Sequence, residues 1–514
     1  MTENRRLLKA LLASALSLAL CVSFCGVSPA AGAEPASSDA DLTAGRWMEL
    51  AARYENPYAS DGAPEALNVD VPPGESPDTG MSSQDNLSAW WKSLDDETLT
   101  KLIEWSLLNN RDLAQARSKV RESRASLGIA KSALLPWLDS SNTWTKSDTS
   151  ENSTSRGQEL EISHLGIDAS WEIDIFGGRH QDMAAGAATL EADYAALHAA
   201  WVSLSSEVAL NYLSLRTLQE RLSVAEQNLA LQTETLSLLE SRHAAGFVDS
   251  LALNQERYTI EQTKAAIPPM RASIEATMNA LSILTGSLPG SLEEMLAPRK
   301  PLPGLDGANL TGIPANSLRQ RPDIRAAERR LTAQLARIKS AEADRYPRFY
   351  LAGSIGLESL TGGSLFSGDS FGYSFGPRVT LPIFHGRAIR SNIEIQRERA
   401  EQLLAAYENT VLSAAAEVRD ALAASAQEMA RNASLRAGAE AAHAALVVAQ
   451  DKYNNGLTDF GSVITSQQAL LSFVEAVAVS NGQTVSNVVR VYKAMGGGWA
   501  PIAQETSGEA EARR

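Results

Sequence analysis

Cysteine and histidine are both scarce in this 514-residue chain. The two cysteines, Cys21 and Cys25, stand close together near the N-terminus, so no disulfide framework is expected in the rest of the chain. The six histidines are His164, His180, His198, His243, His385 and His443. They are scattered without metal-ligand spacing, and no nucleophile elbow or phosphate loop is present. The sequence therefore predicts no metal, no cofactor and no catalytic residue.

Positive charge is in deficit. The formal net charge is −15, and residues 1–33 carry three positive charges and one negative, so a chain cleaved after residue 33 would carry −17. Nucleic acids bind basic surfaces, because their phosphates are negative. No nucleic acid partner is expected.

Long hydrophobic runs are absent after residue 33. A helix that crosses a bilayer needs a run of about 18 apolar residues or more, so no membrane-spanning helix is predicted. Membrane-spanning strands give a much weaker signal, and this absence therefore does not exclude them.

The first 33 residues have the pattern of a secretory signal peptide. Basic residues precede an apolar run over residues 10–22, and "AGA" at 31–33 matches a cleavage site. An arginine pair near the start hints at a twin-arginine address, but the rest of that motif is poor and ordinary secretion is favoured. Leu20 and Phe24 precede the two cysteines, where a lipoprotein site needs a small residue. A processed chain without a lipid anchor is expected.

The remaining chain repeats itself. Three matches occur at offsets of 211, 208 and 210 residues. They are Pro136 with Pro347, "FGGR" at 176–179 with "FHGR" at 384–387, and Gly246 with Gly456. A unit of this length indicates a duplicated domain rather than a solenoid repeat. The expected organisation is a signal peptide over 1–33, an extended segment over 34–84, a first repeat over 85–290, a linker over 291–315, a second repeat over 316–500 and a flexible tail over 501–514.

Each repeat has the same expected order: helix, strand, polar loop, strand, long helix, turn and returning helix. The first repeat is expected to contain a helix over 96–135, strands over 137–149 and 164–176, and a long helix over 179–245. The second is expected to contain a helix over 322–345, strands over 349–357 and 371–383, and a long helix over 387–454. The fold class is therefore mainly α with a small β part.

The long helices carry a coiled-coil pattern, with seven residues spaced by seven from Tyr194 to Leu236. At 1.5 Å per residue, a helix over 179–245 is roughly 100 Å long. A single globular chain cannot bury the apolar stripe of so long a helix, so partner helices are expected.

The strands predict a barrel that several chains share. In the strand over 371–383, one face is apolar and the other is small or polar. The expected lipid-facing residues are Tyr373, Phe375, Val379 and Leu381, and the expected lumen-facing residues are Ser374, Arg378 and Thr380. Spanning strands must close, because a bilayer cannot satisfy an open edge. Two chains would give eight strands and a filled barrel, and three would give twelve strands and an open lumen.

Two glycine-arginine pairs, Gly178-Arg179 and Gly386-Arg387, follow strands and precede the long helices. Glycine permits the sharp bend needed there. We therefore expect these pairs to mark the junction between the barrel and the helices.

Several stretches together resemble one family. They are "AWWKSLDDETLTKLIEWSLLNNRDLAQARSKV" from residue 89, "IDIFGGR", "LPIFHGR", the turns at Gly246 and Gly456, and "VYKAMGGGW" at 491–499. In these stretches the chain resembles the TolC-like outer membrane factors of tripartite efflux pumps, especially the OprM-like and NodT-like branch. The resemblance implies a homotrimer with a twelve-stranded barrel in outer membrane lipid and a helical tunnel in the periplasm. It also implies a periplasmic adaptor and an inner membrane pump of RND type as partners.

The turns at Gly246 and Gly456 are expected to end the tunnel in the periplasm. The resemblance implies that these tips dock the adaptor, through Gly246, Phe247, Asp249, Gly456, Leu457 and Asp459. It also places an acidic ring nine residues after the second glycine, but Thr465 stands there. The candidate gate residues are therefore Asp459, Phe460 and Thr465, and Asp249 is expected to cap the returning helix.

Other functions remain open at this point. The same architecture would serve as the outer membrane duct of a type I protein secretion system. A periplasmic coiled-coil adaptor or a coiled-coil scaffold would also have long helices. Neither of these last two classes would have duplicated strand-to-helix junctions.

Overall fold

A computed structural model describes residues 89–152, 159–304, 320–360 and 362–498, all within the compact unit Gly80–Arg514. The predicted signal peptide, the extended segment over 34–84, the tail over 501–514 and part of the linker lie outside these residues.

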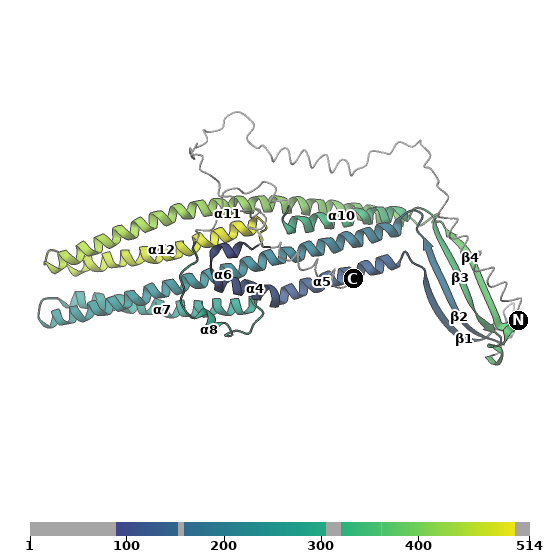
Figure 1. Ribbon diagram of the computed structural model, residues 1–514, viewed down its shortest axis with the longest axis horizontal. Helices are drawn as coiled ribbons and strands as arrows, with labels where there is room; N and C mark the ends of the chain where they lie inside the picture. Colours follow the sequence, from purple (N-terminus) through teal and green to yellow (C-terminus); the bar gives the residue numbers. More distant parts are fainter. Residues whose placement is uncertain (1–88, 153–158, 305–319, 361, 499–514) are drawn as a thin grey trace, which may run out of the picture. The chain divides into compact units, whose positions relative to one another are not determined.

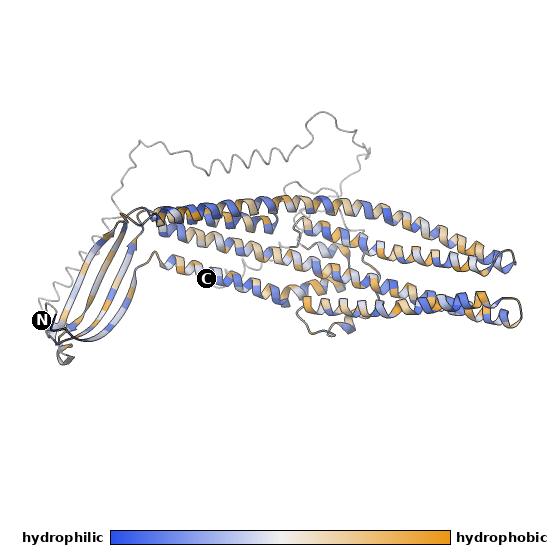
Figure 2. Cartoon of the chain, turned by 180° about the vertical axis from the view of Figure 1, so that it is seen from behind, coloured by the Kyte–Doolittle hydropathy of each residue, from blue (hydrophilic) through white to orange (hydrophobic). Residues whose placement is uncertain are grey.

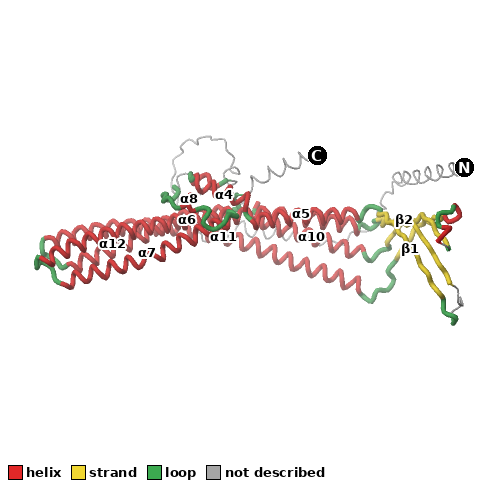
Figure 3. The backbone as a smooth tube through the Cα atoms, turned by 90° about the horizontal axis from the view of Figure 1, so that it is seen from below, coloured by secondary structure: helices red, strands yellow, loops and turns green. Residues whose placement is uncertain are grey.

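Helices make up most of the described chain, and one small sheet accompanies them (Figures 1 and 3). The longer helices are α4 (Glu97–Asn109), α5 (Arg111–Ser132), α6 (Gly178–Ala244), α7 (Ser250–Leu284), α10 (Pro322–Ala343), α11 (Ala388–Asn454) and α12 (Phe460–Ala494). The short ones are η1 (Trp90–Leu94), α8 (Glu293–Leu296), η2 (Gly362–Ser364) and η3 (Gly368–Ser370). The strands are β1 (Trp137–Asp148), β2 (Glu159–Ile173), β3 (Arg348–Ser359) and β4 (Phe371–Thr380). The predicted class, mainly α with a small β part, is confirmed.

The prediction of a single helix over 96–135 is wrong, because the helix is interrupted at Asn110. The Oδ1 atom of Asn110 accepts a hydrogen bond from the amide of Leu113 at 3.0 Å, and its Nδ2 donates to the carbonyl of Leu284 at 2.9 Å. Asn110 thus ends α4 through its backbone, and its side chain begins α5 and ties both helices to the end of α7. Asparagine favours such capping positions over helix interiors.

The duplication has a more regular offset than the motifs indicated. Helices α6 and α11 each have 67 residues and start at Gly178 and Ala388, an offset of 210. Their N-cap residues, Gly177 and Arg387, are both left-handed, with φ of 77° and 70°. The match of "FGGR" with "FHGR" at 208 is therefore two residues out of structural alignment, and the position of Gly177 is taken by an arginine in the second repeat.

The sheet is antiparallel in the order β1-β2-β3-β4. Its register places mostly apolar residues on one face: Leu138, Ala169, Gly353 and Phe375 in one line, and Ser140, Ile167, Ile355 and Tyr373 in the next. The opposite face carries Ser141, Asp168, Ser354 and Ser374. Hydrophobic and hydrophilic residues accordingly alternate along the strands (Figure 2). The predicted alternation is clear in β2, β3 and β4, whereas β1 is polar over most of its length.

Strand β4 is shorter than predicted, because it ends at Thr380 and leaves Leu381 and Ile383 outside. Its partner β3 begins at Arg348, which lies opposite Thr380. Residues 381–383 therefore have no strand to pair with among the described residues of one chain.

The main core lies where the two repeats meet. Helix α6 packs against α4, α5, α7, α10 and α12, and α11 packs against α10 and α12. Trp90 is fully buried there and stacks on Tyr492 with ring centroids 5.6 Å apart. The predicted heptad residues Trp201, Val208 and Leu215 are buried in this core, as coiled-coil packing requires.

One described helix, α12, is long and apolar enough by length and composition to cross a membrane, which the sequence did not lead us to expect. Its residues Val485, Val488 and Val489 belong to the main core. That part of α12 therefore packs as a core helix.

Candidate functional site

The two helical tips have the same construction. Gly246 and Gly456 are left-handed, with φ of 80° and 71°. In each turn the glycine amide donates to the carbonyl three residues back, and the next amide donates to the carbonyl five residues back. This is the pairing that closes a helix at a left-handed glycine, as the sequence predicted.

The aspartates that follow these glycines cap the returning helices. The Oδ1 atom of Asp249 accepts from the amide of Ala252 at 3.0 Å. The Oδ1 atom of Asp459 accepts from the amide of Ser462 at 3.0 Å and from its hydroxyl at 2.9 Å. Each carboxylate is thus fixed at a helix N-terminus, where its charge is stabilised by the helix dipole.

The tips are held together by a small core. It consists of Leu239, Ala252, Leu253, Ala449, Phe460, Val463 and Ile464. The ring of Phe460, a candidate gate residue, packs edge-on against Tyr453, with centroids 5.2 Å apart. Arg242 lies over the same tyrosine at 5.6 Å and donates to Asn454 at 3.3 Å. Phe460 is therefore a packing residue that joins the two hairpins.

The other predicted tip residues are exposed. Phe247 and Leu457 occupy equivalent places after the two glycines and are 83% and 75% exposed. The hydroxyl of Thr465 donates to the carbonyl of Gly461 at 2.8 Å, within its own helix. Each tip thus presents one exposed apolar side chain and one capping carboxylate.

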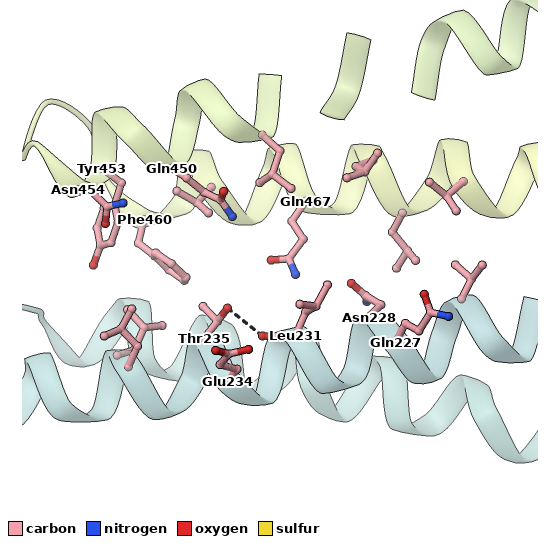
Figure 4. Close-up of a pocket in the computed structure, with 18 residues that line it drawn as sticks. Gln227, Asn228, Leu231, Glu234, Thr235, Gln450, Tyr453, Asn454, Phe460 and Gln467 are labelled. Carbon is pink, nitrogen blue, oxygen red and sulfur yellow. Dashed lines mark hydrogen bonds between the residues drawn. The ribbon is translucent and has the colours of Figure 1, made fainter. Parts of the chain in front are cut away.

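A cavity of about 400 Å³ lies between the two hairpins, next to the tip core and on its side away from the turns (Figure 4). Leucines from α6, α11 and α12 line it together with the amides Gln227, Asn228, Gln450 and Gln467. The Nδ2 atom of Asn228 is buried and has no hydrogen-bond partner in the part of the chain that the structure describes. The hairpins are therefore less tightly packed at this cavity than in the tip core.

Glu256 is a residue that the sequence reasoning missed. It is 0% exposed on α7, and neither carboxylate oxygen has a hydrogen-bond partner among the described residues. Burial raises the pKa of Glu256 to about 7. The spacing of Leu253, Glu256 and Ile260 could have revealed it, because a glutamate stands at a seam position of the heptad pattern.

The first strand-to-helix junction is pinned by side chains. The Oδ2 atom of Asp174 accepts from the amide of His180 at 2.8 Å, and Arg179 pairs with Glu172 at 2.9 Å. Phe176 stacks on Tyr346 with centroids 4.7 Å apart. Gly178 lies so close to α10 that a Cβ there would come within 3.1 Å of the Cβ of Ala343.

The second junction has fewer such contacts. Gly386 and Arg387 are both left-handed, with φ of 54° and 70°, and no side chain caps α11 within the described residues. Ile383 is 89% exposed. The predicted junction residues thus lie where the strands meet the helices in both repeats, but only the first junction is held within one chain.

No group of three or more His, Cys, Asp and Glu side chains suited to a metal ion occurs in the described ranges.

Sequence comparison then decides the family. The family model for outer membrane efflux proteins matches residues 102–287 and 313–497.

The chain belongs to the outer membrane efflux protein family. It is 32% identical to the outer membrane protein OprJ of Pseudomonas aeruginosa over 417 residues, which are 80% of this chain and 86% of that protein. It is 28% identical to nodulation protein T of Rhizobium leguminosarum bv. trifolii, covering 88% of this chain and 98% of that one. The solved outer membrane channel OprN is similar in structure, with a TM-score of 0.77, 31% identity and coverage of 83% and 99%.

Membership of this family places the chain in the outer membrane, with a large periplasmic part. Members are channels rather than enzymes.

Proposed function

We propose that this protein is the outer membrane duct of a tripartite efflux system. It passes substrates from an inner membrane pump of RND type, through a periplasmic adaptor, to the exterior, and it performs no chemistry. The sheet supports this proposal most directly, because an apolar face and a polar face run together across β2, β3 and β4, and β2 and β4 are followed by helices of 67 residues. Three copies would share a twelve-stranded barrel with a water-filled lumen.

In this proposal the inner membrane pump, and not the duct, selects the substrate. Similar proteins include the outer membrane component of a toluene efflux pump from Pseudomonas putida and a cation efflux protein, CusC, from Escherichia coli. One duct architecture thus accompanies cargoes of very different chemistry. A wide polar passage admits them all, and the inner membrane pump decides which are delivered.

The tips are the proposed docking point for the adaptor. Replacing the exposed Leu457 with aspartate should abolish capture of an adaptor and pump after crosslinking in cells, because a charge would replace an apolar contact. The purified variant should still conduct in planar bilayers, since Leu457 contributes nothing to the tip core. Phe366→Asp changes an equally exposed residue in the β3–β4 loop and should capture the adaptor normally. Capture of the adaptor at the wild-type level by Leu457→Asp would contradict docking at the tips.

Asp459 is the proposed electrostatic element of the closed end, where three carboxylates would face one another and repel. Because Asp459 also caps α12, alanine would remove the cap and the charge together. Asparagine caps a helix as well as aspartate does but is neutral. Asp459→Asn should therefore change channel conductance or its response to divalent cations without weakening the tip. Asp459→Ala should change the same channel property and should also weaken the tip. An Asp459→Asn channel with the conductance and the cation response of the wild type would refute the electrostatic gate.

A further inference from the structure

The cavity between the α6–α7 hairpin and the α11–α12 hairpin is long and narrow. Its lining residues run over 224–239 of α6 and over 460–474 of α12, and each stretch is roughly 22 Å long at 1.5 Å per residue. A volume of about 400 Å³ over that length is a passage of roughly 18 Å² in cross-section. An α-helix with its side chains is roughly 10–12 Å across, so the cavity does not admit a partner helix.

The walls of the cavity are mostly apolar. Helix α6 contributes Val224, Leu231 and Leu238, which are spaced by seven, and α12 contributes Val463 and Leu470 from the other side. Leu231 and Leu238 are 60% and 52% exposed, although their spacing places them on one stripe of the helix. Covering such apolar surface releases free energy in proportion to the area removed from water. The walls therefore favour a hydrocarbon occupant.

Amide side chains interrupt these apolar walls. Asn228 reaches into the gap from α6, and Gln467 reaches into it from α12 (Figure 4). Asn228 is only 8% exposed, and its Nδ2 atom is the one buried side-chain nitrogen or oxygen without a hydrogen-bond partner among the described residues that line the cavity. Its neighbour Gln227, by contrast, donates to the hydroxyl of Ser223 at 3.2 Å. A buried donor without an acceptor is costly, so the cavity favours an occupant that supplies an acceptor beside Asn228.

The charges around the cavity restrict the polar end of an occupant. No lysine, arginine or histidine occurs among the described residues that line it. An anionic group would therefore lose its hydration and gain no counter-charge. Glu234 is the one acidic residue of this lining, and it is exposed to water, which screens its attraction for a cation. Asn228 offers a donor, which a cation cannot accept. The polar end is therefore uncharged and accepts a hydrogen bond.

We propose that this cavity is a binding site for an elongated, uncharged molecule, a hydrocarbon chain that ends in a hydroxyl, carbonyl or ether oxygen. The oxygen accepts a hydrogen bond from the Nδ2 atom of Asn228. From there the chain runs toward the tip core over roughly 16 Å, between Leu231 and Leu238 of α6 and Val463 of α12. A bound molecule contacts both hairpins and holds them at one spacing. The site is complete within one chain, so this inference goes beyond the proposed duct and does not depend on it.

Photolabelling of the purified channel, held in an amphipathic polymer without detergent, tests the site. The probe is dodecanol with a diazirine at the far end of its chain, and the comparison probe is dodecane with the same diazirine. Light expels nitrogen from the diazirine and leaves a carbene, which inserts into a neighbouring bond, and mass spectrometry of proteolytic peptides locates the adducts. Dodecanol should label residues 231–239 and 460–467. Dodecane should label them about fivefold less, because it lacks one hydrogen bond.

A variant of Asn228 separates the hydrogen bond from the available space. Asn228→Ala removes the donor and enlarges the cavity, so it should lower labelling by dodecanol about fivefold and should not lower labelling by dodecane. Asn211→Ala is the matched control, because Asn211 lies on the same helix outside the cavity and donates to the carbonyl of Glu207 at 2.9 Å. That control should label like the wild type. Adducts on the apolar face of the sheet normalise for the partition of each probe into the polymer.

Two results would overturn the inference. Equal labelling of the wild type by dodecanol and dodecane would show that no acceptor is recognised, and this comparison decides the matter even if Asn228→Ala does not fold. Absence of adducts from both helical stretches would show that protein, rather than a small molecule, covers these walls. Either result leaves the proposed duct intact, because the conductance of the same preparation in planar bilayers tests the duct separately.

Discussion

Replacing Glu256 with glutamine is expected to raise the free energy of unfolding by about 3 kcal/mol above pH 7 and to leave it nearly unchanged below pH 4.5. The carboxyl of Glu256 has a pKa near 7 in the folded chain against an ordinary value of 4.5. Between these values the unfolded chain ionises while the folded chain keeps its proton, so the penalty grows as the pH rises. Glutamine has no charge to bury and escapes this penalty.

The measurement is the urea midpoint of the helical circular dichroism signal at several pH values between these limits. Glu261→Gln is the matched control, because Glu261 lies on the same helix, is largely exposed and pairs with Lys264. That control should shift the midpoint little and equally at all pH values. A gain from Glu256→Gln that does not depend on pH would show that Glu256 is not a buried titrating group.

Replacing Gly286 with alanine is expected to cost about 3 kcal/mol of stability, through backbone strain and overpacking together. Gly286 ends α7 with φ of 70°, and a Cβ atom there would collide with the carbonyl oxygen of Asn109 at the end of α4. Asn110 ties the same two helices together, so the contact cannot relax without disturbing that cap.

Gly246→Ala separates the two causes. Gly246 has a similar φ of 80°, but a Cβ there would meet nothing within 4 Å. It should therefore cost only the left-handed strain, about 1 kcal/mol. Thermal unfolding of the detergent-solubilised variants, followed by circular dichroism, gives the comparison. Equal losses of stability for the two variants would mean that the close contact between α4 and α7 adds nothing to the cost of a Cβ atom at residue 286.

The sequence predicted the order of the elements and most of their positions, because both periodicities are strong in this chain. It placed the first strand over 137–149, and the structure has Trp137–Asp148. It misplaced β2, which begins at Glu159 and ends at Ile173. The start of β2 also alternates, but Leu160 and Ile162 are out of phase with the apolar residues from Leu165 onward. At the other end, Asp174 lies outside the strand and accepts from the amide of His180 in the following helix.

The tip residues could be located from glycine and aspartate alone, since both turns obey local capping rules. The burial of Phe460 could not, because it depends on which faces of the helices in the two hairpins meet at the tip. The end of β4 was predicted at Ile383 and lies at Thr380 in the single chain. Residues 381–383 lie outside the strand because β3 begins at Arg348 and offers them no ladder partner.

The unpaired edges of β1 and β4 bear on how the protein is made. A newly exported copy would present two open strand edges and an apolar row that includes Tyr373 and Phe375, each 73% exposed. Such edges pair with any available strand, and an unassembled copy is therefore prone to aggregate. In the shared barrel proposed above, assembly needs encounters between copies, and aggregation needs encounters between chains as well, so the two processes compete for the same exposed edges. A factor that shields the sheet from other chains before membrane insertion would therefore raise the yield of the proposed channel.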